Sequence, residues 1–189
     1  MPEYIAAQVF RKQVYGRDEC NQKEFEECTF IACDFSAVNF IAVTFVDCTF
    51  DRCTFNGAQI NHVSFRTVHF RDCQLRDLNF AMCDKLIFEV HFKSCTLDFS
   101  KFYGMKLNAS TFTDSSLVAA DFMATDLTHV TFDNCDLYRA EFDKANAQRC
   151  DFASARHFSI DPEKTKIQKA IFPRYGLSGL LLQHDIEVV

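Results

Sequence analysis

Large apolar residues recur at every fifth position along most of the chain. The series slips once, by two residues, and then resumes at Ile87. In the second run Phe and Leu alternate, and only Ala147 is small. The members are Phe25, Phe30, Phe35, Phe40, Phe45, Phe50, Phe55, Ile60, Phe65, Phe70, Leu75 and Phe80, then Ile87, Phe92, Leu97, Phe102, Leu107, Phe112, Leu117, Phe122, Leu127, Phe132, Leu137, Phe142, Ala147 and Phe152.

A second series, of mostly small residues, lies two positions before the first, and the other three positions of each five are mostly polar. Its members include Cys28, Cys33, Val38, Val43, Cys48, Cys53, Ala58, Val63, Val68, Cys73, Val90, Cys95, Ser100, Ser110, Ser115, Ala120, Thr125, Val130, Cys135, Ala140, Ala145 and Cys150. The pairing of a large with a small residue favours inward layers that interlock at high density.

Neither an α-helix nor a flat strand brings both series into one core. Steps of five residues advance about 140° around a helix, and side chains alternate between the faces of a strand. A chain that turns by about 90° every five residues does bury both series. Four such sides complete a square coil, and the next coil stacks at a spacing of about 4.8 Å. The pattern therefore predicts an all-β, quadrilateral β-helix about 35 Å long, in which Phe occupies two opposite sides of the later coils and Leu the other two.

The β-helix is predicted to span residues 1–160, with the phase slip at residues 81–87. Phe10, Tyr15 and Cys20 continue the period toward the N-terminus, with polar residues two positions before each, so we expect a frayed first coil that caps this end. The slip is either a tolerated bulge or a kink that shapes the rod for a partner.

Residues 161–189 differ in character and are predicted to form a C-terminal cap and dimerisation segment. Asp161-Pro162 marks a turn before them. Leu177, Leu180, Leu181 and Leu182 fit a short helix, and Ile186, Val188 and Val189 fit a terminal strand. Because the last coil of a β-helix is an open edge, these residues are expected to cover it. The candidate cap and dimer residues are Leu177, Leu180, Leu181, Leu182, Ile186 and Val188.

Composition and charge narrow the functional classes. The chain has 22 Phe, no Trp and a formal net charge of −6, which disfavours direct binding to nucleic acid. The first twelve residues lack the apolar core of a secretory signal, and no stretch is long and apolar enough to span a membrane. We therefore expect a cytoplasmic protein.

Eight of the ten cysteines occupy the small inward position, stacked from coil to coil, as in Cys33, Cys53 and Cys73. Metal or disulfide chemistry is the alternative to packing. Stacked ligands share one direction rather than forming a tetrahedron, however, and the chain has no C-x₂-C pair. The sequence thus predicts cysteines that act as small core residues and no metal site. Cys20 and Cys83 fall outside the slot, and their state is left open.

Acidic residues fall into two classes. Asp or Asn directly before the large residue fits a structural role, because these side chains bond to nearby turn backbone, although an acidic binding face is the alternative. Acids after the large residue point to solvent. Residues 24–51 hold six acids and no Lys or Arg, residues 107–138 hold five and none, and residues 52–106 hold eight bases against five acids. On a rigid rod, such blocks can steer a cationic partner. The candidate partner-binding acids are Glu26, Glu27, Asp47, Asp51, Asp114, Asp133 and Asp143.

Catalytic motifs are missing from the sequence. The six His are scattered, and there is no Gly-rich phosphate loop, G-x-S-x-G element or metal-ligand spacing. We therefore predict a protein that is not an enzyme and that uses no cofactor.

The five-residue period resembles the pentapeptide-repeat family, whose consensus is A(D/N)LxX. Residues 120–124 (ADFMA) and 150–154 (CDFAS) are near matches, and the resemblance covers roughly residues 25–152. It implies a right-handed quadrilateral β-helix, which agrees with the geometry argued above.

Within that family the chain is similar to the quinolone-resistance (Qnr) group. Val9-Phe10, Tyr15, Cys20, Phe25, residues 26–30 (EECTF) and residues 33–35 (CDF) follow that group's F-x₄-F…F-x-x-C-x-F spacing, and Asp161-Pro162 and Ile186-Glu187-Val188 resemble its C-terminal end. This resemblance, shared with the mycobacterial fluoroquinolone-resistance protein, implies a dimeric rod that imitates duplex DNA and binds DNA gyrase. Qnr proteins carry two longer loops where this chain has only the slip; the mycobacterial protein lacks such loops.

The leading hypothesis is therefore a DNA-mimicking rod that binds DNA gyrase or topoisomerase IV, modulates it and can confer quinolone resistance. The alternative is a structural or scaffolding solenoid for another protein partner, or a module that acts with a neighbouring gene product. The basic residues between Arg52 and Lys106 interrupt the negative surface that duplex DNA would present.

Overall fold

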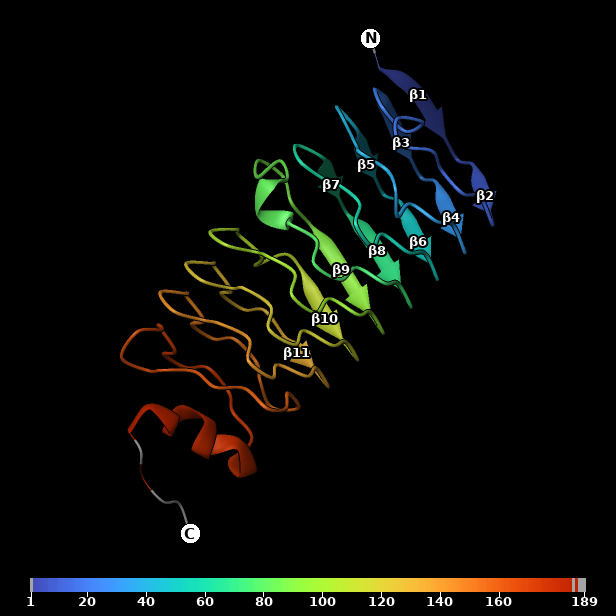
Figure 1. Ribbon diagram of the computed structural model, residues 1–189. Helices are drawn as coiled ribbons and strands as arrows, with labels where there is room; N and C mark the ends of the chain where they lie inside the picture. The colour runs from blue at the N-terminus through green and yellow to red at the C-terminus, as the bar shows by residue number, and fades with distance from the viewer. Residues whose placement is uncertain (1, 185, 187–189) are drawn as a thin grey trace.

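The chain coils into a parallel β-solenoid of about seven turns with a short helical segment near the C-terminus, as predicted. The computed structural model describes residues 2–184 and 186. The coils stack into a rod with the N-terminus at one end and the C-terminal cap at the other (Figure 1).

Two of the four sides form sheets whose neighbouring strands are all parallel. Side 1 is a sheet of four strands in the order β1-β3-β5-β7, and side 2 has seven in the order β11-β10-β9-β8-β6-β4-β2. The strands are β1 (Glu3–Ala6), β2 (Val9–Arg11), β3 (Lys23–Glu26), β4 (Thr29–Ile31), β5 (Thr44–Val46), β6 (Thr49–Asp51), β7 (Ser64–Arg66), β8 (Val68–Arg71), β9 (Val90–Lys93), β10 (Thr111–Thr113) and β11 (Phe132–Asp133). Each is short because the chain turns after every side.

Sides 3 and 4 are held by single parallel bridges from coil to coil. Side 3 includes Asp34↔Thr54 and Ser116↔Asp136, and side 4 includes Asn39↔Gln59. Bridges such as Asp126↔Asn146 also extend side 1 beyond its sheet. The predicted division at residues 160 and 161 stays a prediction, and the bridges continue across it to Ile171.

Left-handed backbone recurs at the corners, two positions after a large core residue. Asp47, for example, has a φ of +50°. Such a conformation costs a non-glycine residue about 1–2 kcal/mol. The Asp47 amide donates to the carbonyl of Arg66 in the next coil at 2.9 Å, and this ladder bond offsets part of that cost. The corners are thus formed mostly without glycine, in agreement with only five Gly in the chain.

Stacked aromatic columns fill the core. On side 2, Phe92, Phe112 and Phe132 stack with ring centroids 5.2 and 5.1 Å apart. On the opposite side 4, Phe102 stacks on Phe122 at 5.1 Å. The alternating leucines are fully buried on the two remaining sides, so the predicted layering is confirmed: these are Leu97, Leu107, Leu117, Leu127 and Leu137.

The phase slip contains one wrong prediction. Ile87, expected in the core, is 48% exposed, whereas Phe88 is buried. Asp84 leads into a turn that projects Leu86 into solvent, with the Asp84 carboxylate accepting from the Leu86 amide at 2.9 Å. The two extra residues lengthen the chain on this side, so that the larger Phe88 reaches the core. Burial of Phe88 removes more apolar surface from water than burial of Ile87 would. The short 3-10 helix η1 (Phe80–Met82) lies directly before this segment.

Both cysteines whose state the sequence left open are buried in the core. Cys20 continues the large-residue series of side 4. Cys83 takes the small inward position, with its thiol 3.3 Å from the carbonyl oxygen of Ile60. Cys83 and Ile60 are 23 residues apart in the chain, as are Cys53 and Phe30, whose contact is of the same kind. The small-residue series therefore continues through the slip.

The two ends of the rod are closed differently. At the N-terminus, the polar side chains of Gln8, Gln13 and Asp18 are exposed on the first coil. The strands of this coil pair in register with those of the second coil. At the C-terminus, the 3-10 helices η2 (Arg174–Leu180) and η3 (Leu182–His184) form the cap. Val188 and Val189 of the predicted terminal strand lie outside the described residues. Among the described residues, no helix is long and apolar enough to cross a membrane.

Candidate protein-binding surface

Three candidate acids gather at the N-terminal half of the corner between sides 1 and 2. Glu26 accepts a short hydrogen bond from the Tyr4 hydroxyl of the preceding coil. The amide of Glu27 donates to the Val46 carbonyl at 3.0 Å, which places Glu27 one coil from Asp47. Glu27 and Asp47 are exposed. These residues, Glu26, Glu27 and Asp47, form the N-terminal acid group.

Two more candidate acids meet at the corner between sides 2 and 3, in the C-terminal half of the rod. The Asp114 amide donates to the Asp133 carbonyl at 2.8 Å. The Asp114 carboxylate accepts from the Asn134 side-chain amide at 2.8 Å, and that of Asp133 accepts from the Ser154 hydroxyl at 2.9 Å. Asp114 and Asp133 form the C-terminal acid group, and these hydrogen bonds hold both carboxylates in fixed positions.

The other two candidate acids, Asp51 and Asp143, belong to neither acid group. Each lies near a basic side chain. Asp51 is ion-paired with Arg52 at 2.8 Å. Asp143 lies at the corner between sides 4 and 1, with the Lys164 ammonium 3.6 Å away. Asp51 shares a strand register with Arg71, and Arg71 with Lys93, so bases separate the two acid groups. The acidic surface is therefore divided.

Acids that precede the large residue bond mainly to their own turns, which confirms the structural interpretation for most of them. Asp34 accepts from the Ser36 amide at 2.9 Å, and Asp121 accepts from the Met123 amide at 2.8 Å. The hydrogen bonds from Ser36 lower the pKa of Asp34. The same contact to the residue two positions on is made by Asp126, Asp136, Asn146 and Asp151.

The predicted cap residues occupy two environments. Leu180 packs against the core, and Leu181 is half-buried. Leu177, Leu182 and Ile186 are exposed by 46%, 64% and 55%. Val188 lies outside the described residues. Part of the cap thus seals the last coil, and part is free to contact another molecule.

Gly179 ties this cap to the rod. Its carbonyl accepts from the Ile160 amide at 3.0 Å. A Cβ at this position would lie 2.3 Å from the Phe158 carbonyl oxygen, so only glycine allows this approach.

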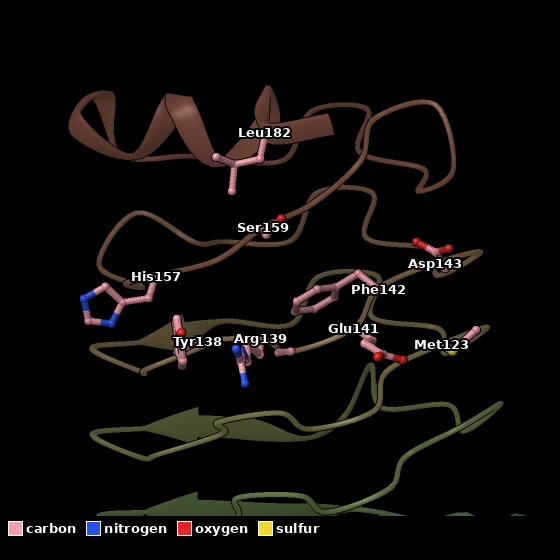
Figure 2. A pocket seen from close by; sticks show the side chains of 10 residues that line it. Met123, Tyr138, Arg139, Glu141, Phe142, Asp143, His157, Ser159 and Leu182 are labelled. Carbon is pink, nitrogen blue, oxygen red and sulfur yellow. The ribbon is translucent and has the colours of Figure 1, made fainter. Parts of the chain in front are cut away.

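Sequence reasoning missed a hollow between the last coils and the cap. It has a volume of about 550 Å³ and is lined by residues that include Tyr138, Glu141, His157 and Leu182. Figure 2 shows Leu182 reaching from the cap over the residues of the coils below. His157 lies 2.9 Å from the Asp136 carboxylate, and Arg139 lies over the Tyr138 ring. The period of five could not indicate this hollow, because it depends on how the cap sits.

The cysteines follow the packing prediction. The eight cysteines expected inside are buried free thiols, and stacked pairs such as Cys33 and Cys53 contact through the amide of one and the sulfur of the other, at 3.4 Å. Across residues 2–184 and 186, no group of three His, Cys, Asp or Glu side chains is arranged to hold a metal ion.

A match to a known protein-family model identifies the family of this chain. The model described as "Pentapeptide repeat region" matches residues 23–86 and 85–157, which is most of the chain. This chain is a pentapeptide-repeat protein. The comparison with curated proteins finds no match.

Solved structures of other pentapeptide-repeat proteins share the fold at low identity. HetL, described as involved in heterocyst differentiation regulation in the cyanobacterium Nostoc sp. strain PCC 7120, has a TM-score of 0.72 at 12% identity, covering 91% of this chain and 88% of its own. Trypsin-treated QnrB1, described as a plasmid-mediated fluoroquinolone resistance protein, has a TM-score of 0.66 at 16% identity, covering 98% and 100%. Full-length QnrB1 gives 0.56 at 17% identity, covering 97% and 100%. At these identities the likeness establishes the fold alone.

Proposed function

We propose that this pentapeptide-repeat protein is a non-enzymatic binding protein, a DNA-mimicking rod that binds DNA gyrase or topoisomerase IV and modulates it. The observation that carries the proposal is the pair of acid groups on adjacent corners of the rod. Carboxylates held at coil spacing present negative charge at regular intervals along one axis, as a nucleic acid backbone does. The sequence resemblance to the Qnr group supplies the identity of the partner.

The surroundings of these acids support a role in recognition. Neither acid group takes part in an ion pair among the described residues, in contrast to Asp51 and Asp143. Carboxylates outside ion pairs need not break an ion pair when they meet a cationic surface, and long-range attraction accelerates such an encounter. The ten free, buried thiols fit a reducing compartment, so a cytoplasmic location is part of the proposal.

A supercoiling assay with purified bacterial gyrase tests the proposal. We expect micromolar protein to change both the supercoiling activity and the sensitivity of the enzyme to a quinolone. The triple variant Glu26→Gln/Glu27→Gln/Asp47→Asn should weaken the effect by about tenfold or more, because it removes three charges from one contact. The control Asp77→Asn/Glu141→Gln/Glu163→Gln removes three exposed acids on other corners and sides and should keep the effect. No response of gyrase or topoisomerase IV to the unmodified protein would contradict the proposal.

We further propose that the rod is a homodimer joined through its C-terminal cap. The cap exposes Leu177, Leu182 and Ile186, and Leu182 also lines the hollow of Figure 2. Apolar area of this kind is stabilised when a second copy covers it. Light scattering after gel filtration should show a dimer, and Leu177→Glu/Leu182→Glu should give a monomer. Val14→Glu, at a 78%-exposed position near the other end, is the matched control and should stay dimeric.

The alternative function is a scaffold for a different protein partner. The neutralised Asp51 and Asp143 favour it, because they reduce the likeness to uniformly charged duplex DNA. Absence of any effect on gyrase, together with recovery of a non-topoisomerase partner that requires the same acid groups, would establish this alternative.

A further inference from the structure

A two-by-two array of basic side chains lies on side 2, between the two acid groups. His69 and Arg71 point outward from β8, on either side of the buried Phe70, and His91 and Lys93 do the same on β9. The strands pair in register, His69 with His91 and Arg71 with Lys93. The spacing is therefore about 4.8 Å between strands and about 6.6 Å along each strand. This is the basic array.

The array lines a shallow groove whose far edge carries hydroxyl groups. The groove has a volume of about 270 Å³ and is bounded on β10 by Thr111 and Thr113. Thr111 Oγ1 lies 3.0 Å from His91 Nδ1, and the two imidazole rings stack with centroids 4.7 Å apart. Six donor-bearing side chains thus converge on a space large enough for a small molecule.

The two permanent charges of the array have no counterion within the described part of the chain. Among residues 2–184 and 186, neither Arg71 nor Lys93 forms an ion pair, although the two stand directly opposite each other. Like charges in that arrangement repel and destabilise a sheet. Asp51 on β6 also pairs in register with Arg71, but its carboxylate is already ion-paired with Arg52. An anion in the groove would remove the repulsion.

We propose that this groove is a binding site for a phosphate group, either inorganic phosphate or a small phosphomonoester. A phosphate carries a charge of about −1.5 to −2 at neutral pH and three or more acceptor oxygens, which matches the charge of Arg71 plus Lys93 and the number of converging donors. A carboxylate offers one charge and two oxygens, so it satisfies half of the array. The site is independent of the proposed contact with gyrase.

His69 reports on the site without adding to its charge. Partial burial, then the neighbouring His91 and Arg71, lowers the pKa of His69, so this ring is neutral at pH 7 and donates through one N–H. Glu89 Oε1 lies 3.4 Å from His91 Nε2, and Asp47 also acts on His69 through space. A bound phosphate changes the surroundings of both rings, and their ring-proton resonances will shift.

The test is a titration of the full-length protein at pH 7 and constant ionic strength, followed by the imidazole C–H resonances. Inorganic phosphate should shift His69 and His91 along a saturating curve and leave His62, His129, His157 and His184 unchanged. Arg71→Gln/Lys93→Gln should weaken binding by about tenfold or more, since charge-assisted hydrogen bonds are the strong ones. Lys101→Gln, which removes an exposed charge on the opposite side 4, should bind as the parent does. Circular dichroism of each variant checks that the coil is intact.

The remaining measurements distinguish a site for inorganic phosphate from a site for a phosphomonoester, and they include the results that would overturn the proposal. Tighter binding of phenyl phosphate than of inorganic phosphate would identify a phosphomonoester site, and equal binding a site for the free ion. Acetate at the same concentration should bind more weakly than phosphate and give smaller shifts, because it offers one charge and two oxygens. Equal shifts for acetate, a common shift of all six histidines, or an unweakened double variant would overturn the proposal. A response to a short DNA duplex but to neither small phosphate would replace it with a nucleic-acid surface.

Discussion

Phe102 stacks on Phe80 with ring centroids 4.9 Å apart and ring planes within 3° of parallel. This pair spans the phase slip, and it is as well aligned as Phe102 with Phe122 in uninterrupted coils, at 5.1 Å and 4°. The two inserted residues are therefore absorbed on side 1, and side 4 continues without displacement.

Deletion of Lys85 and Leu86 tests that explanation. The deletion restores the period of five, so Ile87 should replace Phe88 in the core and the urea-derived free energy of unfolding should change by no more than about 2 kcal/mol. Deletion of Thr128 and His129, in an uninterrupted coil, is the control and should destabilise the protein severely, because the core residues of the following coils lose their register. Similar losses in both variants would show that the slip is required for the fold.

Truncation of a stacked ring should be costly. Phe112 is fully buried between Phe92 and Phe132, and Phe112→Ala should lower the free energy of unfolding by about 3–5 kcal/mol through the cavity that it opens. Glu26→Ala loses one hydrogen bond, from Tyr4, at the rod surface and should cost less than about 1 kcal/mol. Urea denaturation measures both. Equal midpoints would contradict the assignment of inward and outward positions.

The cysteines should be unreactive in the native protein. Burial raises the pKa of Cys20, Cys48 and Cys135 to about 12, so at pH 8 these groups are protonated thiols as well as shielded ones. An aromatic disulfide reagent should label none of the ten cysteines rapidly in native protein and all ten in guanidinium chloride. Rapid labelling of even one thiol in the folded state would show that part of the core is open.

The period of five predicts most of the fold because it acts on every coil. Core positions, the layering of Phe and Leu, and the packing of cysteines follow from which residues are large and which are small. Ile87 and Phe88 could not be told apart this way, since both are apolar and the choice depends on the path of a turn. The same limit applies to the hollow beside Leu182, which depends on the placement of the cap.

The candidate surface was predicted less completely. Sequence position indicates that Glu27, Asp47, Asp114 and Asp133 face solvent, and they do. It does not reveal that Asp143 lies near Lys164, because that contact depends on the path of the last coil. In the sequence, the basic array appears only as an excess of basic residues. Its residues pair across β8 and β9, and the phase slip lies between these two strands in the chain.

The most direct measurement of the central claim is a competition between the rod and DNA for gyrase. A labelled duplex is bound to purified gyrase at equilibrium, and its apparent Kd is measured at increasing concentrations of the protein. A DNA mimic occupies the surface that DNA uses, so the apparent Kd should rise in proportion to the concentration of the protein, and Glu26→Gln/Glu27→Gln/Asp47→Asn should weaken this effect. An unchanged Kd, or a ternary complex of gyrase, DNA and rod, would contradict the account.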